Sequence, residues 1–222
     1  MSSTLSEAYD RLLQRYGRQG WWPADSPLEV MVGAVLVQNT AWRNVERAIE
    51  NLREAGLLDA RRLAKLHAAE LAELIRPAGY YRLKAARLQN LMRLLVERYD
   101  ASLERMFDAD PHLLRDELLA VKGIGRETAD SILLYAANLP FFVVDAYTHR
   151  VLARHGWIDF EADYDALQSH CTSELPNEVA VYNEMHALLV EVGKTHCKKK
   201  QPLCEGCPLE DMLPSSGVQE PW

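Results

Sequence analysis

The 222-residue sequence has no apolar run near the roughly 18 residues that a membrane-spanning helix needs, and its first residues lack the basic and apolar blocks of a signal peptide. It also has no excess of positive charge, since its formal net charge is −7 at pH 7. Strand-like alternation is nearly absent, and we find no internal repeat. These absences predict a globular, cytoplasmic protein without a membrane partner, and they leave the partner class to local motifs.

The acidic average does not exclude nucleic acid, because phosphate is attracted by a local basic face and not by the mean charge of a molecule. Lys122 and Arg126 flank a glycine turn, and the lysines at 198–200 are consecutive. A third basic group comprises Arg76, Arg82, Lys84 and Arg87. Each group taken alone is better explained as an ordinary solvated surface.

Helical periodicity is the main pattern that the sequence does have. Apolar residues return at spacings of three and four, as in Leu88, Leu91, Leu94 and Leu95, and Gly and Pro divide the chain into about ten segments of helix length. We predict an all-α protein with two helical domains. Residues 24–135 form a core domain that ends in two helical stretches joined by a glycine turn. Residues 1–23 and 136–222 form the second domain, with a Cys-rich C-terminal loop.

The most informative segment joins two apolar helical stretches through Gly123-Ile124-Gly125. Glycine allows the positive φ and the close backbone approach that a tight turn between helices requires. Backbone N–H groups at the head of the second helix suit a phosphate oxygen. An isolated G-x-G is more often a plain turn between core helices. The segment that follows the second helix, described next, favours the other interpretation, in which Lys122, Gly123, Gly125 and Arg126 bind DNA phosphate.

An acidic residue, Asp145, follows an apolar stretch and precedes another helical segment. The helix dipole and the free N–H groups at a helix N-terminus keep such a carboxylate ionised. Asp145 can therefore be an N-cap worth about 1 kcal/mol and nothing more. Beside a pocket, it can also stabilise positive charge on a deoxyribose as the base leaves, and activate water. Asp145 is the candidate catalytic residue.

Together these motifs resemble the endonuclease III superfamily of DNA glycosylases, which have a helix-hairpin-helix, a Gly/Pro-rich loop and a catalytic aspartate. The resemblance covers nearly the whole chain, and it implies that the two helical domains flank a DNA-binding cleft and that the helix-hairpin-helix ends the core domain at residues 24–135. Residues 27–40 resemble the first core helix and the glutamine, here Gln38, that fills the gap left by a flipped base. Residues 79–85 resemble the loop, here with Tyr80, that wedges into the duplex. The resemblance implies a monomeric base-excision repair enzyme that flips a damaged base from double-stranded DNA and hydrolyses its N-glycosidic bond.

One departure from the family concerns Glu127. Members of the family that also cut the DNA strand carry a lysine nucleophile at this position, just after the hairpin. A carboxylate cannot form a Schiff base with the sugar. The departure predicts a monofunctional glycosylase without AP-lyase activity.

The expected substrate is an alkylated purine such as 3-methyladenine. Trp21-Trp22-Pro23 and the segment from Gln38 to Trp42 resemble the bacterial 3-methyladenine DNA glycosylases. That resemblance implies that Trp22, Pro23 and Trp42 line the base pocket, and an alkylated, cationic purine stacks well on indole. One alternative is an endonuclease III-like glycosylase for oxidised pyrimidines or mismatches. Another is a non-catalytic helix-hairpin-helix module, which would need neither Asp145 nor an aromatic pocket.

Three of the four cysteines follow a C-x6-C-x2-C pattern: Cys197, Cys204 and Cys207. In a cytosolic chain this spacing favours a metal or iron–sulfur site over disulfides. It resembles the first three ligands of the [4Fe-4S] loop of many endonuclease III relatives, but Leu213 stands at the fourth position. The fourth ligand is therefore unknown: a cluster with an unusual ligand such as His196, a zinc site and a metal-free loop all stay open. We expect Cys171 to be a buried small apolar residue.

Overall fold

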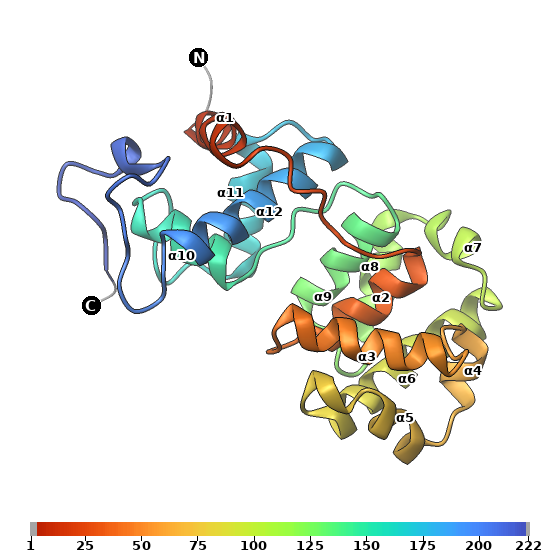
Figure 1. The fold of residues 1–222 in the computed structure, drawn as a ribbon. Helices are drawn as coiled ribbons and strands as arrows, with labels where there is room; N and C mark the ends of the chain where they lie inside the picture. Colours follow the sequence, from red (N-terminus) through yellow and green to blue (C-terminus); the bar gives the residue numbers. More distant parts are fainter. Residues whose placement is uncertain (1–3, 221–222) are drawn as a thin grey trace. The chain divides into compact units, whose positions relative to one another are not determined.

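The computed structural model describes residues 4–220, which are helical with no β-strand among them (Figure 1). Residues 1–3 and 221–222, at the ends of the predicted second domain, lie outside the described residues. The predicted all-α class is confirmed. The chain divides into two compact units, Trp22–Leu139 and Met1–Trp21 with Pro140–Trp222. None of the described helices is long and apolar enough to cross a membrane.

The unit Trp22–Leu139 is built around α2 (Pro27–Leu36), whose residues from Glu29 to Leu36 are all buried. Ser26 begins this helix by accepting a hydrogen bond from the amide of Glu29, and Pro27 suits the first turn because its fixed φ is already helical. The helices packed against α2 are α3 (Trp42–Glu54), α6 (Tyr81–Tyr99), α9 (Arg126–Ser131) and the π-helical turn η2 (Ile132–Ala136). The shorter elements of this unit are α4 (Ala60–Lys65), α5 (Ala68–Leu74), η1 (Arg76–Ala78), α7 (Leu103–Phe107) and α8 (Pro111–Ala120).

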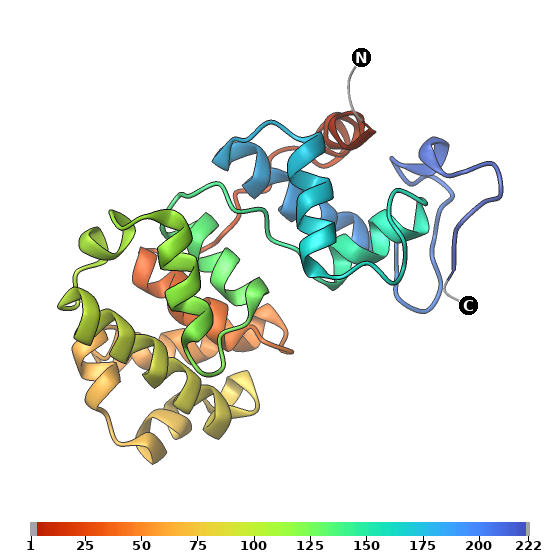
Figure 2. The same cartoon turned by 180° about the vertical axis from the view of Figure 1, so that it is seen from behind.

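Helices α8 and α9 form the predicted helical hairpin, which Figure 2 shows from behind. Ile124 of the connecting turn is 5% exposed, so it packs back into the core. The two helices are also joined by an ion pair between Arg115 and the fully buried Asp130, with Nε–Oδ1 and Nη2–Oδ2 distances of 2.6 and 3.1 Å. This two-pronged contact fixes the angle between the helices that present the turn.

The second unit contains α1 (Thr4–Tyr16), α10 (Ala146–Arg154), α11 (Tyr164–Glu174), α12 (Val179–Thr195) and the short turn η3 (Glu210–Met212). The long helix α12 packs against α1 and α10. Gly193 makes the approach to α10 possible, since a Cβ at this position would lie 2.5 Å from Cδ1 of Tyr147. Asp145 is the residue directly before α10, so this packing determines what surrounds its carboxylate.

Candidate functional site

Asp145 is the N-cap of α10, as expected. Its Oδ1 accepts a hydrogen bond of 2.7 Å from the amide of Thr148, and the three residues before it, Phe142 to Val144, are buried. The cap turns the carboxylate into the start of the helix, where the free N–H groups favour its negative charge. The side chain is 13% exposed, so the carboxylate still reaches the surface of its unit.

His186 on α12 lies next to the same carboxylate, with its Nε2 3.6 Å from Oδ2 of Asp145. Burial raises the pKa of Asp145, but the adjacent imidazole and the Thr148 amide act in the opposite direction and outweigh it. The net result is a pKa below the ordinary aspartate value. Asp145 is therefore an anion at neutral pH, although most of its surface is covered.

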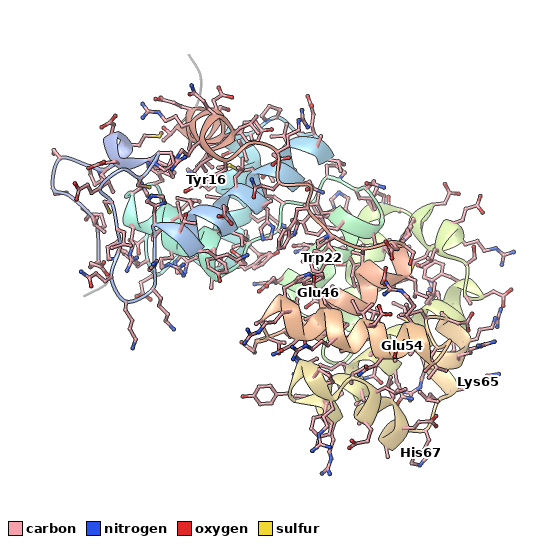
Figure 3. All side chains as sticks on the ribbon, viewed as in Figure 1. Tyr16, Trp22, Glu46, Glu54, Lys65 and His67 are labelled. Carbon is pink, nitrogen blue, oxygen red and sulfur yellow. The ribbon has the colours of Figure 1, made fainter. Side chains whose placement is uncertain are left out.

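Three aromatic rings of the unit Trp22–Leu139 lie together. The centroid of Trp22 is 5.2 Å from that of Trp42, edge to face, and 5.2 Å from that of Tyr135 on η2. Trp42 also donates from Nε1 to Oε1 of Glu46 at 3.0 Å. Figure 3 labels Trp22 and Glu46 in this unit. Pro23 is exposed beside them. The three residues expected to hold a base are thus neighbours, with a carboxylate at the edge of the group.

Gly33 of α2 gives these indoles their room. A Cβ at Gly33 would lie 3.3 Å from Nε1 of Trp22 and 3.5 Å from Cη2 of Trp42. The distance to Trp22 is tighter than an ordinary Cβ contact, and the distance to Trp42 is an ordinary one, so a side chain larger than a methyl group here would displace the rings. The absence of a side chain at this position therefore contributes to the shape of the aromatic group.

Gln38 is held by the hairpin and by α6. Its Nε2 donates to Oγ1 of Thr128 at 2.9 Å and to the carbonyl of Gly123 at 3.3 Å, and its Oε1 accepts from Nη1 of Arg87 at 2.5 Å. Gly123 has a φ of +99°, and a Cβ there would lie 2.3 Å from Cγ of Arg87. Glycine is required on both counts. The turn and the half-buried Gln38 are therefore parts of one hydrogen-bonded network.

The residues expected to bind phosphate present an exposed surface at this turn. Lys122, Gly125 and Arg126 are exposed, and the carbonyl of Lys122 is held by Nδ2 of Asn90 at 3.0 Å. Gly125 is in an extended conformation as the N-cap of α9, with no atom within 4 Å of the place where a Cβ would be. The backbone N–H groups that follow it begin a helix, which is the arrangement that favours an anion.

Tyr80 projects from the turn before α6. Its side chain is 71% exposed, and it adopts a left-handed backbone conformation with a φ of +46°. A bulky residue in this region carries backbone strain, which the surrounding structure has to compensate. Tyr80 is therefore an exposed aromatic side chain held in a strained turn.

Lys84 lies beneath this turn and is buried. The prediction that it belongs to a basic surface group with Arg76, Arg82 and Arg87 is therefore wrong. Only 1% of its surface is exposed. Its Nζ donates to the carbonyls of Leu36 and Ala78 and to Oγ1 of Thr40, at 2.7 to 2.8 Å. The lysine thus joins the end of α2 to the turn that carries Tyr80. Sequence pattern missed this role because a lysine within an amphipathic helix normally indicates the solvent face.

The three cysteines of the C-terminal loop line one small cavity, together with Leu213 at the position of the missing fourth ligand. Burial raises the pKa of Cys207 and of Cys204, and the neighbouring thiols add to the effect. Within residues 4–220, however, no three Cys, His, Asp or Glu side chains are gathered closely enough to hold a metal ion. The residues present therefore do not fit the four-thiolate site of a standard [4Fe-4S] cluster.

Arg154 of α10 holds this loop. Its guanidinium donates to the carbonyls of Lys198 and Lys199 at 2.7 and 3.2 Å, and lies 3.6 Å from the sulfur of Cys197. The lysine side chains of the loop are exposed. Cys171 is fully buried on α11, as expected, and burial raises the pKa of its thiol to about 12. It is an apolar core residue and not a fourth ligand.

Sequence reasoning also missed His186, which has no motif. It lies in an apolar stretch of α12, and a lone histidine on such a face is more often a core residue than a functional one. The signal that could have found it is a histidine within an apolar helical stretch, since a buried polar ring has to be compensated by a hydrogen bond or a charge.

The comparisons with known proteins agree with this architecture. The family described as "HhH-GPD superfamily base excision DNA repair protein" matches residues 32–177. A Methanocaldococcus jannaschii protein named "Putative DNA repair glycosylase MJ1434" is 48% identical over 208 residues, which cover 93% of this chain and 94% of that protein. Endonuclease III of Thermotoga maritima is 32% identical over 185 residues, with 83% and 81% covered. The structure of H. pylori 3-methyladenine DNA glycosylase bound to 1,N6-ethenoadenine has a TM-score of 0.73 and 30% identity, with 86% and 94% covered.

The chain belongs to the HhH-GPD superfamily of base excision DNA repair proteins, since the family match spans more than half of it. Within that superfamily it is a DNA glycosylase. The resemblance to the endonuclease III superfamily seen in the sequence is confirmed.

Proposed function

We propose that this protein is a monomeric, monofunctional glycosylase that removes an alkylated purine such as 3-methyladenine from double-stranded DNA. The observation that carries the proposal is the ionised, partly exposed carboxylate of Asp145 at the head of α10. The 30% identity with the H. pylori 3-methyladenine enzyme and the cluster of Trp22, Trp42 and Tyr135 support the choice of base.

Asp145 acts on the sugar and not on the base in this mechanism. The C1′–N bond breaks with its electron pair going to the base, so a cationic alkylpurine leaves as a neutral molecule and positive charge develops on the deoxyribose. The Asp145 anion stabilises that charge. Water then attacks C1′ and gives its proton to Asp145, which later releases it to solvent. An alkylated base already leaves easily, so one carboxylate supplies enough acid–base chemistry.

Trp22, Pro23 and Trp42 hold the flipped base by stacking. Gln38 and Tyr80 occupy the space that the base leaves in the duplex. The exposed turn with Lys122, Gly123, Gly125 and Arg126 binds phosphate without reading sequence. Each role is transferred from the resemblance, and the exposure and the contacts described above support it.

The missing lysine argues against strand cleavage. Glu127 is exposed in the first turn of α9, and a carboxylate there provides no amine to attack the sugar. The identity with endonuclease III of Thermotoga maritima favours one alternative, a glycosylase for oxidised pyrimidines or mismatches. The two possibilities differ in the base that is removed and not in the carboxylate that does the chemistry.

The test incubates the protein with duplexes that contain 3-methyladenine, thymine glycol, uracil or a mismatch, followed by alkali. We expect strand breaks at 3-methyladenine only, after alkali only, and their loss in Asp145→Asn with DNA binding retained. Asp163→Asn is the matched control, because Asp163 caps α11 of the same unit by the same type of bond to Ala166. Full activity of Asp145→Asn would refute the mechanism, and breaks without alkali would refute the absence of lyase activity.

A second test addresses the phosphate contacts. Lys122→Glu and Arg126→Glu should each weaken binding to damaged and undamaged duplexes alike, and should lower the slope of log K against log salt by about one. Lys65→Glu is the control, because Lys65 is an exposed lysine at the C-terminal end of α4, distant in sequence from the turn. An unchanged slope in both hairpin variants would exclude the turn as a phosphate site.

We further propose that the C-terminal loop binds a metal group through Cys197, Cys204 and Cys207, a [4Fe-4S] cluster being favoured over zinc by the resemblance. The fourth corner does not fit, so we assign this group no chemical step. Its role would be structural, in holding the exposed lysines of the loop toward DNA. Anaerobic purification followed by iron, sulfide and zinc analysis tests this, and protein free of all three would exclude it.

A further inference from the structure

A buried imidazole on α12 has a restricted choice of partners. His186 is 5% exposed, and the neighbouring residues Met185, Ala187, Leu188 and Leu189 are buried and apolar. Burying a polar ring among such side chains is unfavourable unless a polar or charged group compensates. The carboxylate of Asp145 is the acid that faces it, 3.6 Å from Nε2.

The two oxygens of Asp145 have different surroundings. Oδ1 is fixed by the amide of Thr148 on the carboxylate's own helix, at 2.7 Å. Oδ2 faces His186 across the packing of α10 on α12. A distance of 3.6 Å is too long for a strong hydrogen bond but well within the range of charge attraction. The Thr148 amide therefore fixes Oδ1, which caps the helix. His186 acts on Oδ2, which remains available for the reaction.

Other titratable groups near this carboxylate are engaged elsewhere. Arg150 donates to the carbonyls of Cys197 and Gly193, Glu184 accepts from the amide of Gln19, and Lys194 lies over the ring of Trp21. On α11 the hydroxyl of Tyr164 accepts from the amide of Val144. The remaining titratable side chains of α10 and α12 are Tyr147, His149, Arg154, Tyr182 and Glu191, and His155 follows α10 as its C-cap. Of the described residues, His186 is the one that makes an ion-pair contact with Asp145.

We infer that His186 is a positioning residue, which keeps the Asp145 carboxylate ionised and fixes its Oδ2 for the reaction. The inference rests on the role proposed for Asp145. Without the imidazole, only the amide of Thr148 opposes the effect of burial on the negative charge, and the carboxylate is free to rotate about that single anchor. His186 does not itself touch the sugar or the base in this account. It acts through Asp145, whose charge it compensates.

The direct test is a titration of Asp145 in the free protein, followed by NMR of its ¹³C-labelled carboxyl group. We expect His186→Phe to raise the pKa of Asp145 by at least about one unit, because it removes the largest favourable partner and keeps the burial. His186→Gln, which can donate a hydrogen bond but carries no charge, should give a smaller rise. It also serves as the comparison if the phenylalanine variant does not fold.

His155→Phe is the matched control. His155 is also a buried histidine of this unit, but its Nδ1 interacts with the carbonyl of Val151 at 2.7 Å and its ring stacks on Trp157. An unchanged Asp145 titration in both His186 variants overturns the inference. Equal rises in the His186 and His155 variants also overturn it, since they would indicate a general loosening of the unit.

Single-turnover excision of 3-methyladenine then links the pair to the reaction. We expect the rate of His186→Phe to fall about tenfold for each pH unit below the raised pKa, while DNA affinity stays unchanged. If His186→Phe raises the pKa of Asp145 but the wild-type protein removes no 3-methyladenine, the pairing is supported and only the proposed function is refuted. The two failures are therefore distinguishable.

Discussion

Replacing Lys84 with methionine tests how the two loops proposed to meet DNA are held. Lys84 is buried, and its three hydrogen bonds join the end of α2, the Thr40 turn and the turn before Tyr80. Methionine has a similar length and fills irregular space well, so the substitution removes the donors and leaves no large cavity. It isolates the polar contribution of this side chain.

The expected loss of unfolding free energy is modest at neutral pH. In Lys84→Met, the carbonyl of Leu36 loses its donor from Nζ, whereas that of Ala78 keeps the hydroxyl of Thr40 at 2.5 Å. One or two buried acceptors left without this donor cost about 1–3 kcal/mol each, partly offset because methionine requires no desolvation of an ammonium group. We expect a net loss of about 2 kcal/mol, or a lower melting temperature by about 4–8 °C.

The pH dependence gives the sharper test. Burial, with a further effect of Arg87, lowers the pKa of Lys84 to about 8 from the ordinary 10.5. Between these values the unfolded chain binds more protons than the folded one, so the Lys84 contribution to stability rises with pH across that window. At pH 9.5, about 1.5 units above the folded pKa, the gain is about 2 kcal/mol. Methionine has no such gain.

Urea denaturation of both proteins at pH 7 and pH 9.5 measures this difference. We expect the loss of unfolding free energy in Lys84→Met, relative to wild type, to grow from about 2 kcal/mol at pH 7 to about 4 kcal/mol at pH 9.5, because only the wild type gains stability from Lys84. Other titrating groups change both proteins alike. A deficit that is equal at the two pH values would show that the three acceptors keep the lysine at its ordinary pKa, and would refute the reasoning from burial. Binding to damaged duplex should weaken more than binding to undamaged duplex, since the positions of Gln38 and Tyr80 depend on these turns.

Four further substitutions test contacts described above. Asp130→Asn breaks the buried pair with Arg115 and should lower the unfolding free energy by about 3 kcal/mol in urea denaturation; a loss below 1 kcal/mol would contradict a structural role for the pair. Gly123→Ala should destabilise the protein by about 1–3 kcal/mol, because Gly123 has a positive φ and contacts Arg87 of α6. Gly125→Ala should be close to neutral. Equal losses of unfolding free energy in the two variants would contradict the geometry of the turn. Arg154→Met should make the C-terminal loop a site of limited proteolysis, and equal cleavage of variant and wild type would show that other contacts hold the loop.

Much of the fold could be predicted because the local signals agree with one another. Ser26-Pro27 and Asp110-Pro111 are helix starts by capping chemistry alone, and the structure begins α2 and α8 there. Asp145 was expected to cap a helix for the same reason, and it does. The π-helical turn at the end of α9 had no such signal, since its dihedral change depends on how Tyr135 packs against Trp22.

The polar network around the candidate site could not be predicted in the same way. Lys84, Arg87 and His186 are common residue types in ordinary helical positions, and their roles come from contacts with segments distant in sequence. The Arg87 stem fills the space above Gly123, so the glycine that sequence analysis assigned to the turn also accommodates another helix. Periodicity identifies which face of a helix is apolar, but it does not identify which charged residue is the exception.

The contacts of Gln38 bear on how a damaged base can be distinguished from a normal one. In the free protein its amide already has three partners, Thr128, Gly123 and Arg87, so the side chain gains nothing by entering an intact base stack. In the proposed role it exchanges these bonds for those of an unpaired partner base, which exists only where a nucleotide has left the helix. Because the exchange is nearly even in number of bonds, its free energy is small, and flipping is favoured where the base is weakly paired or stacks well on indole. Selectivity then arises from the damaged base and the aromatic group, while Gln38 fills the gap with little change in free energy.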